Sequence, residues 1–161
     1  LYSSLYQNAQ NYCTINIQLI QASEAVVDVK TKAYVIVLFE NSLKKSPILY
    51  TSLSHQFRAM MNKWILEYIG KELSCNIMLQ FSNLIEVVYQ INVEQGWEFV
   101  DFIPTFLKMF EQKEDTNRRK LAISILKKIA ETIPRSARQV LQRGWCNSGG
   151  LHQGRRRRPH H

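Results

Sequence analysis

The chain has 161 residues, of which 45% are hydrophobic and 11% aromatic. This length suits one domain or a short run of repeats, and the composition excludes a disordered chain. The formal net charge of +8 is unevenly spread: positions 1–134 hold 14 Lys and Arg against all 13 acidic residues. We therefore expect a nearly neutral body, with the basic excess in a C-terminal tail rather than on a binding surface of the fold.

The three cysteines have no Cys-x-x-Cys spacing, which predicts free thiols rather than a disulfide framework or a zinc cluster. No apolar run reaches the roughly 18 residues that a membrane helix requires, and no signal peptide opens the sequence. These features predict a soluble intracellular protein that makes no membrane contact. Because the sequence begins with Leu1 rather than Met, we expect it to be an excised piece of a longer protein or an incomplete gene product.

Apolar residues recur with helical periodicity, and only six Gly and four Pro interrupt them, so we expect an all-α fold. The one competing segment, residues 33–39, is rich in β-branched residues that suit a buried strand. It continues to Lys45 without a turn residue, which favours a helix. The predicted helices span residues 5–21, 27–45, 53–70, 75–92, 97–113 and 116–133, and the sixth has Asp115 or Thr116 as its N-cap.

The arrangement of these helices follows from the width of their apolar faces. The predicted helices at 53–70 and 116–133 are apolar over about half of their circumference or more, whereas a surface helix needs an arc of about 100°. Such helices contact neighbours on two or three sides, either in a large bundle or in a solenoid. The second, fourth and sixth helices begin near residues 28, 75 and 116, and these offsets match the ~40 to 47 residue period of HEAT and armadillo repeats.

We therefore predict an α-solenoid of about three HEAT-type helical hairpins over residues 1–142. An irregular Arg-rich tail follows over residues 143–161. The third hairpin, at residues 96–107 and 118–129, resembles the HEAT repeat pattern, with an Ile-Pro in its first helix, acidic residues in the turn and an Arg early in its second helix. Pro104 is expected to bend the first helix, and the Arg to pair with Glu111, Glu114 or Asp115.

The order of the segments resembles the N-terminal domain of the importin-β superfamily. Residues 31–45 look like the second helix of that domain, and segments 56–69, 81–91 and 97–107 follow in the family's order. The resemblance covers about residues 5–141. It implies a nuclear transport receptor that shuttles between cytoplasm and nucleus and binds the GTP-bound form of the small GTPase Ran. Phe-Gly nucleoporins and a cargo protein are the further partners that it implies for a full-length receptor.

In that family Ran meets the exposed side of the second helix of each hairpin. By position, the candidate Ran-binding residues are Asn41, Lys44, Lys45, Asn83, Glu86, Gln90, Lys120, Lys127, Lys128 and Glu131. The competing interpretation for any one of them is an ordinary solvated helix face, since exposed charges are common. Six aromatic residues are expected in the core rather than in docking slots for Phe-Gly repeats: Phe57, Trp64, Tyr68, Phe81, Trp97 and Phe102.

Other classes of function have less support. No His pairs with an acid and a nucleophile, and no Gly-rich phosphate loop is present, so we expect no enzyme, no cofactor and no metal. The alternative function is a HEAT scaffold unrelated to nuclear transport, such as a phosphatase or trafficking subunit. A third hypothesis is nucleic-acid binding through the tail at 143–161, although a frame shift, an unspliced intron or an artificial chain end also explains that tail.

Overall fold

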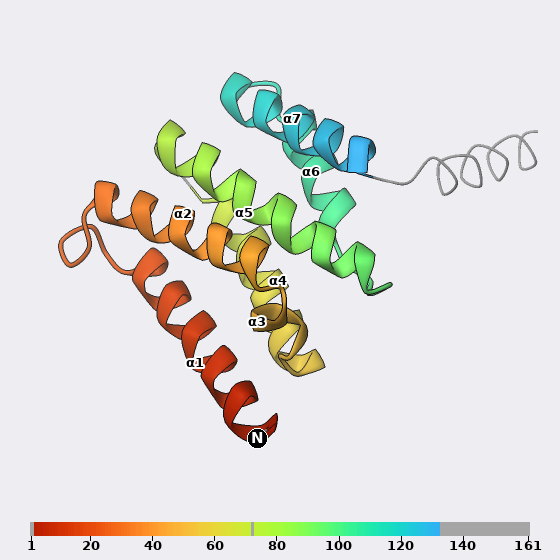
Figure 1. Cartoon of the computed structure of the whole chain (residues 1–161). Coiled ribbons are helices and arrows are strands. Elements are labelled where there is room, and N and C mark those ends of the chain that lie inside the picture. Colours follow the sequence, from red (N-terminus) through yellow and green to blue (C-terminus); the bar gives the residue numbers. More distant parts are fainter. Residues whose placement is uncertain (1, 72, 133–161) are drawn as a thin grey trace, which may run out of the picture. The chain divides into compact units, whose positions relative to one another are not determined.

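A computed structural model describes residues 2–71 and 73–132. Every regular secondary-structure element assigned in these ranges is a helix. They are α1 (Tyr2–Gln21), α2 (Val29–Lys45), α3 (Ile48–Thr51), α4 (His55–Ile69), α5 (Cys75–Glu94), α6 (Phe102–Glu111) and α7 (Thr116–Thr132) (Figure 1). The all-α prediction is confirmed. Residues 33–39 lie inside α2, so the helical interpretation of this β-branched segment is correct.

One short helix was missed and one predicted helix boundary is wrong. The four-residue helix α3 was not predicted, because one turn is too short to display a periodic apolar pattern. The helix predicted at 97–113 begins only at Phe102, because Asp101 adopts a left-handed conformation with φ 61° and ψ 5°. Pro104 is consequently the third residue of α6, where its missing N–H has no intrahelical partner to lose. At this position proline removes no helical hydrogen bond, so it does not require the bend that the sequence predicted.

Side-chain caps fix the starts of four helices. Asp28 Oδ1 accepts a hydrogen bond from the Thr31 N–H at 2.7 Å at the start of α2. Ser54 and Ser74 play the same part for α4 and α5. Asp115 Oδ1 accepts from the Arg118 N–H at 3.0 Å, so Asp115 caps α7. Each such bond satisfies a backbone donor that has no partner within its helix.

The chain divides into two compact units, Leu1–Ile129 and Ala130–His161. The predicted boundary between residues 142 and 143 lies outside the described residues, as do the Arg-rich tail, Cys146 and Pro134. Among the described helices, none is both long and apolar enough to cross a membrane.

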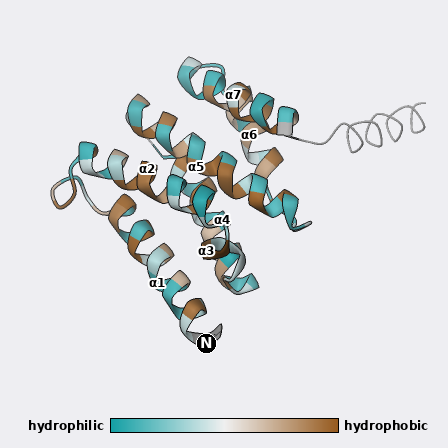
Figure 2. Ribbon diagram, in the orientation of Figure 1, coloured by the Kyte–Doolittle hydropathy of each residue, from teal (hydrophilic) through white to brown (hydrophobic). Residues whose placement is uncertain are grey.

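Within the first unit, α5 is the most enclosed helix. It lies beside α2 along much of its length and also contacts α3 and α4, while α1 packs against α2 and α3 (Figure 1). Ten of its 20 residues are buried. Figure 2 shows polar and apolar residues alternating along each helix, as expected when one side of a helix faces solvent. The apolar sides together form one hydrophobic core.

Aromatic side chains fill the part of this core around α5. Phe81 is fully buried, and its ring centroid lies 4.7 Å from that of Tyr68 and 5.6 Å from that of Trp64. Phe102 is 1% exposed and lies 4.4 Å from Tyr89. The prediction of core positions is confirmed for Tyr68, Phe81 and Phe102. Three others, Phe57, Trp64 and Trp97, are partly buried against the same core.

The two cysteines in the described ranges have opposite environments. Cys13 in α1 is fully buried, whereas Cys75 at the start of α5 is exposed, and both are free thiols. Burial raises the pKa of the Cys13 thiol from 9.0 to about 12, because the thiolate would lose its hydration. Folding therefore disfavours ionisation of Cys13, and its contribution to stability is complete below pH 9 and is lost as pH rises toward 12.

We expect this linkage to be measurable between pH 8 and pH 10. With an unfolded pKa near 9, Cys13 lowers the free energy of unfolding by about 1 kcal/mol over that interval. Urea unfolding at both pH values should therefore show a smaller pH-dependent loss for Cys13→Ala than for the unmodified protein. Cys75→Ala, at the exposed thiol, is the matched control and should keep the full loss. Equal losses in all three proteins would contradict the assignment.

Candidate functional site

The outward sides of α2, α5 and α7 carry the predicted partner-binding residues. Among these residues the exposed ones are Asn41, Lys44, Lys45, Gln90, Lys120 and Lys127, and Glu131 is exposed in the second unit. Asn83, Glu86 and Lys128 are only partly exposed. On α5, Leu79, Asn83, Glu86 and Gln90 follow one another at helical spacing as the strip left uncovered between its buried sides.

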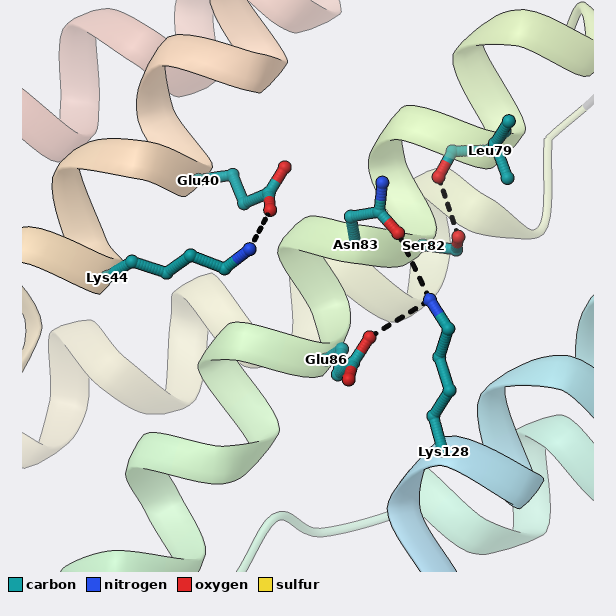
Figure 3. Close-up of polar contacts among 7 residues, drawn as sticks. All are labelled: Glu40, Lys44, Leu79, Ser82, Asn83, Glu86 and Lys128. Carbon is teal, nitrogen blue, oxygen red and sulfur yellow. Dashed lines mark hydrogen bonds and ion pairs between the residues drawn. The ribbon is translucent and has the colours of Figure 1, made fainter. Parts of the chain in front are cut away.

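Several of these residues form ion pairs or hydrogen bonds with one another. Lys128 Nζ lies 3.1 Å from Glu86 Oε2 and 3.2 Å from Asn83 Oδ1, which joins α7 to α5 (Figure 3). On α2, Lys44 Nζ pairs with Glu40, whose side chain is 9% exposed (Figure 3). These contacts give Asn83, Glu86, Lys44 and Lys128 a structural part in addition to any binding.

The remaining lysines on this side are free for a partner. Lys45, Lys120 and Lys127 are exposed, and none forms an ion pair with another residue of the described ranges. The predicted pairing of the early Arg of the third hairpin is also resolved, because Arg118 Nε lies 3.2 Å from Asp115 Oδ2. Neither Glu111 nor Glu114 takes that place.

A second site was not predicted from the sequence. A cavity of about 890 Å³, here named the α4 groove, lies between one side of α4, from His55 to Glu67, and residues 96–105. The α4 positions on its wall recur at intervals of three and four, so they share one face of the helix. Opposite them are the turn at 96–101 and Thr105 in the first turn of α6.

Buried amides line the groove. Asn62 on α4 and Asn92 on α5 are 8% and 2% exposed, and both border the cavity. Tyr50 in α3 joins them: its hydroxyl donates to Asn62 Oδ1 at 2.7 Å and accepts from Asn92 Nδ2 at 2.8 Å. Asn92 Nδ2 also donates to the Val88 carbonyl oxygen at 2.7 Å. Burial raises the pKa of the Tyr50 hydroxyl, against the opposing effect of the Asn92 and Asn62 hydrogen bonds.

A cation and an indole form the wall beside this floor. The Arg58 guanidinium carbon lies 3.6 Å from the centroid of the Trp97 ring, an interaction that attracts a cation to an aromatic face. Arg58 Nη1 also donates to the Leu53 carbonyl oxygen. The backbone N–H of Trp97 donates to the Asn92 carbonyl oxygen at 2.8 Å. The Arg58–Trp97 contact joins the turn at 96–101 to α4, and the Trp97 backbone bond joins it to the C-terminal part of α5.

The turn itself needs two left-handed residues. Gly96 has φ 68° and Asp101 has φ 61°. Glycine reaches this region without steric cost and aspartate is among the residues that tolerate it best. The resulting conformation presents Glu98, Val100 and Asp101 to the cavity.

The charges at the rim are mixed. Lys63 Nζ lies 3.8 Å from Glu67 Oε1, with both side chains well exposed. Glu98 and Asp101 are exposed and form no ion pair with another residue of the described ranges. Their two carboxylates therefore leave a local excess of negative charge on the side opposite α4.

Part of the signal for the α4 groove was available in the sequence. Small or polar residues at 55, 59, 62 and 63 lie on the side of this helix away from its apolar face, and Gly96 announces a turn. What pattern reading could not supply is Tyr50, which brings Asn62 and Asn92 together from 12 and 42 residues away.

Within the described ranges, no three His, Cys, Asp or Glu side chains gather as a metal site would require. Comparison with known proteins finds no match to any family model, curated protein or solved structure.

Proposed function

We propose that this chain is a HEAT-type array of three helical hairpins, α1 with α2, α4 with α5, and α6 with α7. In this proposal it forms the N-terminal part of an importin-β-like transport receptor. Its ligand is the GTP-bound form of Ran, and the contact is made by the outward sides of α2, α5 and α7, here called the B-helix face. The B-helix face comprises Asn41, Lys45, Gln90, Lys120 and Lys127. It also includes the residues that contact one another, Lys44, Asn83, Glu86 and Lys128.

The observation that carries the proposal is the sequence separation of the longest-range hydrogen bonds. Tyr68 Oη donates to the Ile20 carbonyl oxygen across 48 residues, and Asn92 bonds Tyr50 across 42. Arg118 donates to the Lys71 carbonyl oxygen across 47 residues, and Lys128 to Asn83 across 45. A repeat of about 40 to 47 residues places equivalent positions of successive hairpins side by side. These separations support that stacking.

The relation of α7 to α5 supports it further. Asn117, in the first turn of α7, lies 3.9 Å from the Cys75 sulfur at the start of α5, while Lys128 meets Asn83 and Glu86 near the middle of α5. Contacts that advance together along both helices are typical of parallel neighbours. In a stacked array, the second helices of successive hairpins are parallel in this way.

The chemistry of the B-helix face supports a protein ligand with an acidic surface. Its three unpaired lysines, Lys45, Lys120 and Lys127, are exposed. Apolar side chains accompany them: Tyr34 and Leu38 on α2 and Ile123 on α7 are between 44% and 64% exposed. Lysines beside apolar contacts provide steering and buried area together. In a transport receptor, binding of the GTPase here changes cargo affinity at another site through linkage.

The test is binding to Ran in its two nucleotide states. Immobilised Ran loaded with a non-hydrolysable GTP analogue should bind the chain at least tenfold more tightly than Ran with GDP. The combined variant Lys45→Glu, Lys120→Glu and Lys127→Glu should weaken the GTP-state complex at least tenfold, because each reversal places a like charge against the expected acidic surface.

A matched control separates this effect from net charge. Lys63→Glu, Lys108→Glu and Lys113→Glu change the charge by the same amount at exposed positions of α4, of α6 and of the turn after it. This variant should keep the affinity within about twofold. Equal binding to both nucleotide states, or none, would overturn the transport function and favour a HEAT scaffold of another kind.

A further inference from the structure

The lining of the α4 groove extends along one side of α4. Its α4 wall extends from His55 to Glu67, and twelve residues of α-helix rise about 18 Å. An extended chain advances about 3.3 Å per residue, so this wall matches about five residues of an extended peptide. The volume of about 890 Å³ lies within the range of ligand sites of about 300 to 1,000 Å³.

The buried amides determine which groups such a ligand would meet. Tyr50 engages the oxygen of Asn62 and the nitrogen of Asn92. Two side-chain atoms of these amides have no hydrogen-bond partner within the described ranges. They are the Asn62 Nδ2 donor and the Asn92 Oδ1 acceptor. A peptide unit offers one acceptor and one donor, which is the complement of this pair. Because burying a polar group without a partner is costly, the two amides favour a ligand that supplies both.

The rim favours one charge on the ligand. Glu98 and Asp101 face the cavity without an ion-pair partner in the described ranges, whereas Arg58 is engaged by Trp97 and Lys63 lies beside Glu67. A basic side chain at the middle of a bound peptide would reach the two carboxylates. A nucleotide also carries donors and acceptors, but on the side opposite α4 its phosphates would meet Glu98 and Asp101, and these two charges disfavour it.

We propose that the α4 groove binds an extended peptide segment of a partner protein that carries a Lys or Arg. The main chain of the segment pairs with Asn62 Nδ2 and Asn92 Oδ1, and its basic side chain lies against Glu98 and Asp101. This site is separate from the B-helix face, so it stands or falls independently of Ran binding.

The experiment follows ¹⁵N-labelled protein by NMR while probes are titrated. The first probe is the pentapeptide acetyl-Ala-Ala-Lys-Ala-Ala-amide, which should shift the side-chain resonances of Asn62, Asn92 and Trp97 in a saturable way. The second has its two central amides N-methylated and should bind at least tenfold more weakly, because it lacks the donors. The third has norleucine in place of Lys and should bind at least threefold more weakly.

Two variants test the named residues. Asn62→Asp keeps an oxygen for Tyr50 and removes the Nδ2 donor, and should weaken the first probe at least fivefold. Glu98→Gln combined with Asp101→Asn lies at exposed positions and should abolish the preference for Lys over norleucine. Asn tolerates the left-handed conformation of position 101. Its control, Glu111→Gln with Glu114→Gln, removes two exposed acids that do not border the groove and should keep the preference.

Three outcomes would overturn the proposal. The first is equal affinity for the first probe and its N-methylated form, which needs no variant and so does not depend on the folding of Asn62→Asp. The second is a Lys preference that survives loss of both rim carboxylates. The third is a saturable shift of the same resonances on addition of adenosine monophosphate when the pentapeptide shifts none of them.

Discussion

Replacing Phe81 by Ala should lower the free energy of unfolding by about 3 to 5 kcal/mol. The Phe81 ring is fully buried on α5 and contacts Trp64 and Tyr68 of α4. Truncation removes its buried apolar surface and leaves a cavity between two helices whose backbones are held by the rest of the core. Urea denaturation followed by circular dichroism measures the loss as a lower midpoint with an unchanged slope.

The control for this prediction is an aromatic residue of similar size outside the core. Tyr34 on α2 is 64% exposed, so Tyr34→Ala should change the free energy of unfolding by less than about 1 kcal/mol. Similar losses in the two variants would contradict the central position of α5. They would indicate that the contacts between α4 and α5 contribute little to the folded state.

The sequence predicted the helices best where the apolar pattern was long. The runs that became α2 and α5 fill several turns, and each is bounded by a polar N-cap residue, Asp28 or Ser74. In the folded chain α5 is enclosed by three other helices, whereas the wide apolar faces were predicted for the helices at 53–70 and 116–133 rather than for this one. A periodic signal of that length outweighs the β-branched composition of residues 33–39.

Short and irregular segments were beyond this reasoning. A single turn such as α3 contains no full period, and its N-cap residue is Pro47, which also follows the end of the preceding helix. Residues 97–101 contain Trp97, Phe99 and Val100, so they resemble a helix in composition. The conformation of Asp101, which ends this segment, depends on the packing around it and not on a local pattern.

The candidate binding residues illustrate the same division. Helical projection correctly placed Asn41, Lys45 and Gln90 on exposed sides, because exposure follows from the period of the helix. It could not anticipate that Lys128 bonds Asn83 and Glu86 on another helix. The α4 groove depends on contacts between α3, α4 and α5 that are set by tertiary packing, and a one-dimensional pattern does not record these.

Removing the hydroxyl of Tyr50 should also destabilise the fold, although less than removing the Phe81 ring. Tyr50→Phe keeps the buried ring beside Trp97 but deletes the oxygen that joins Asn62 to Asn92. The Asn62 oxygen then lacks its partner, at a cost of about 1 to 3 kcal/mol, whereas Asn92 Nδ2 keeps its bond to the Val88 carbonyl oxygen, so we expect a loss of about 1 to 3 kcal/mol. The same variant should weaken peptide binding in the α4 groove, because the Asn62 amide loses the hydrogen bond that fixes its orientation.

The pH dependence gives this prediction a second readout. Burial raises the pKa of Tyr50 above its ordinary value of 10.0, so the unfolded chain ionises first as pH rises. The stability contributed by keeping this group neutral is therefore complete below pH 10 and falls above it. Tyr50→Phe removes the titrating group, and its unfolding free energy should decline less between pH 10 and pH 11 than that of the unmodified protein.

Tyr12→Phe is the appropriate comparison for Tyr50→Phe. The Tyr12 hydroxyl also donates a hydrogen bond, to Ser42 Oγ at 2.8 Å, but in a partly exposed place where water can replace the lost partner. We expect this variant to lose less than about 1 kcal/mol. If Tyr50→Phe were equally mild, the Asn62 and Asn92 amides would already be hydrated from the cavity. The hydroxyl would then not be what holds α3, α4 and α5 together at the base of the groove.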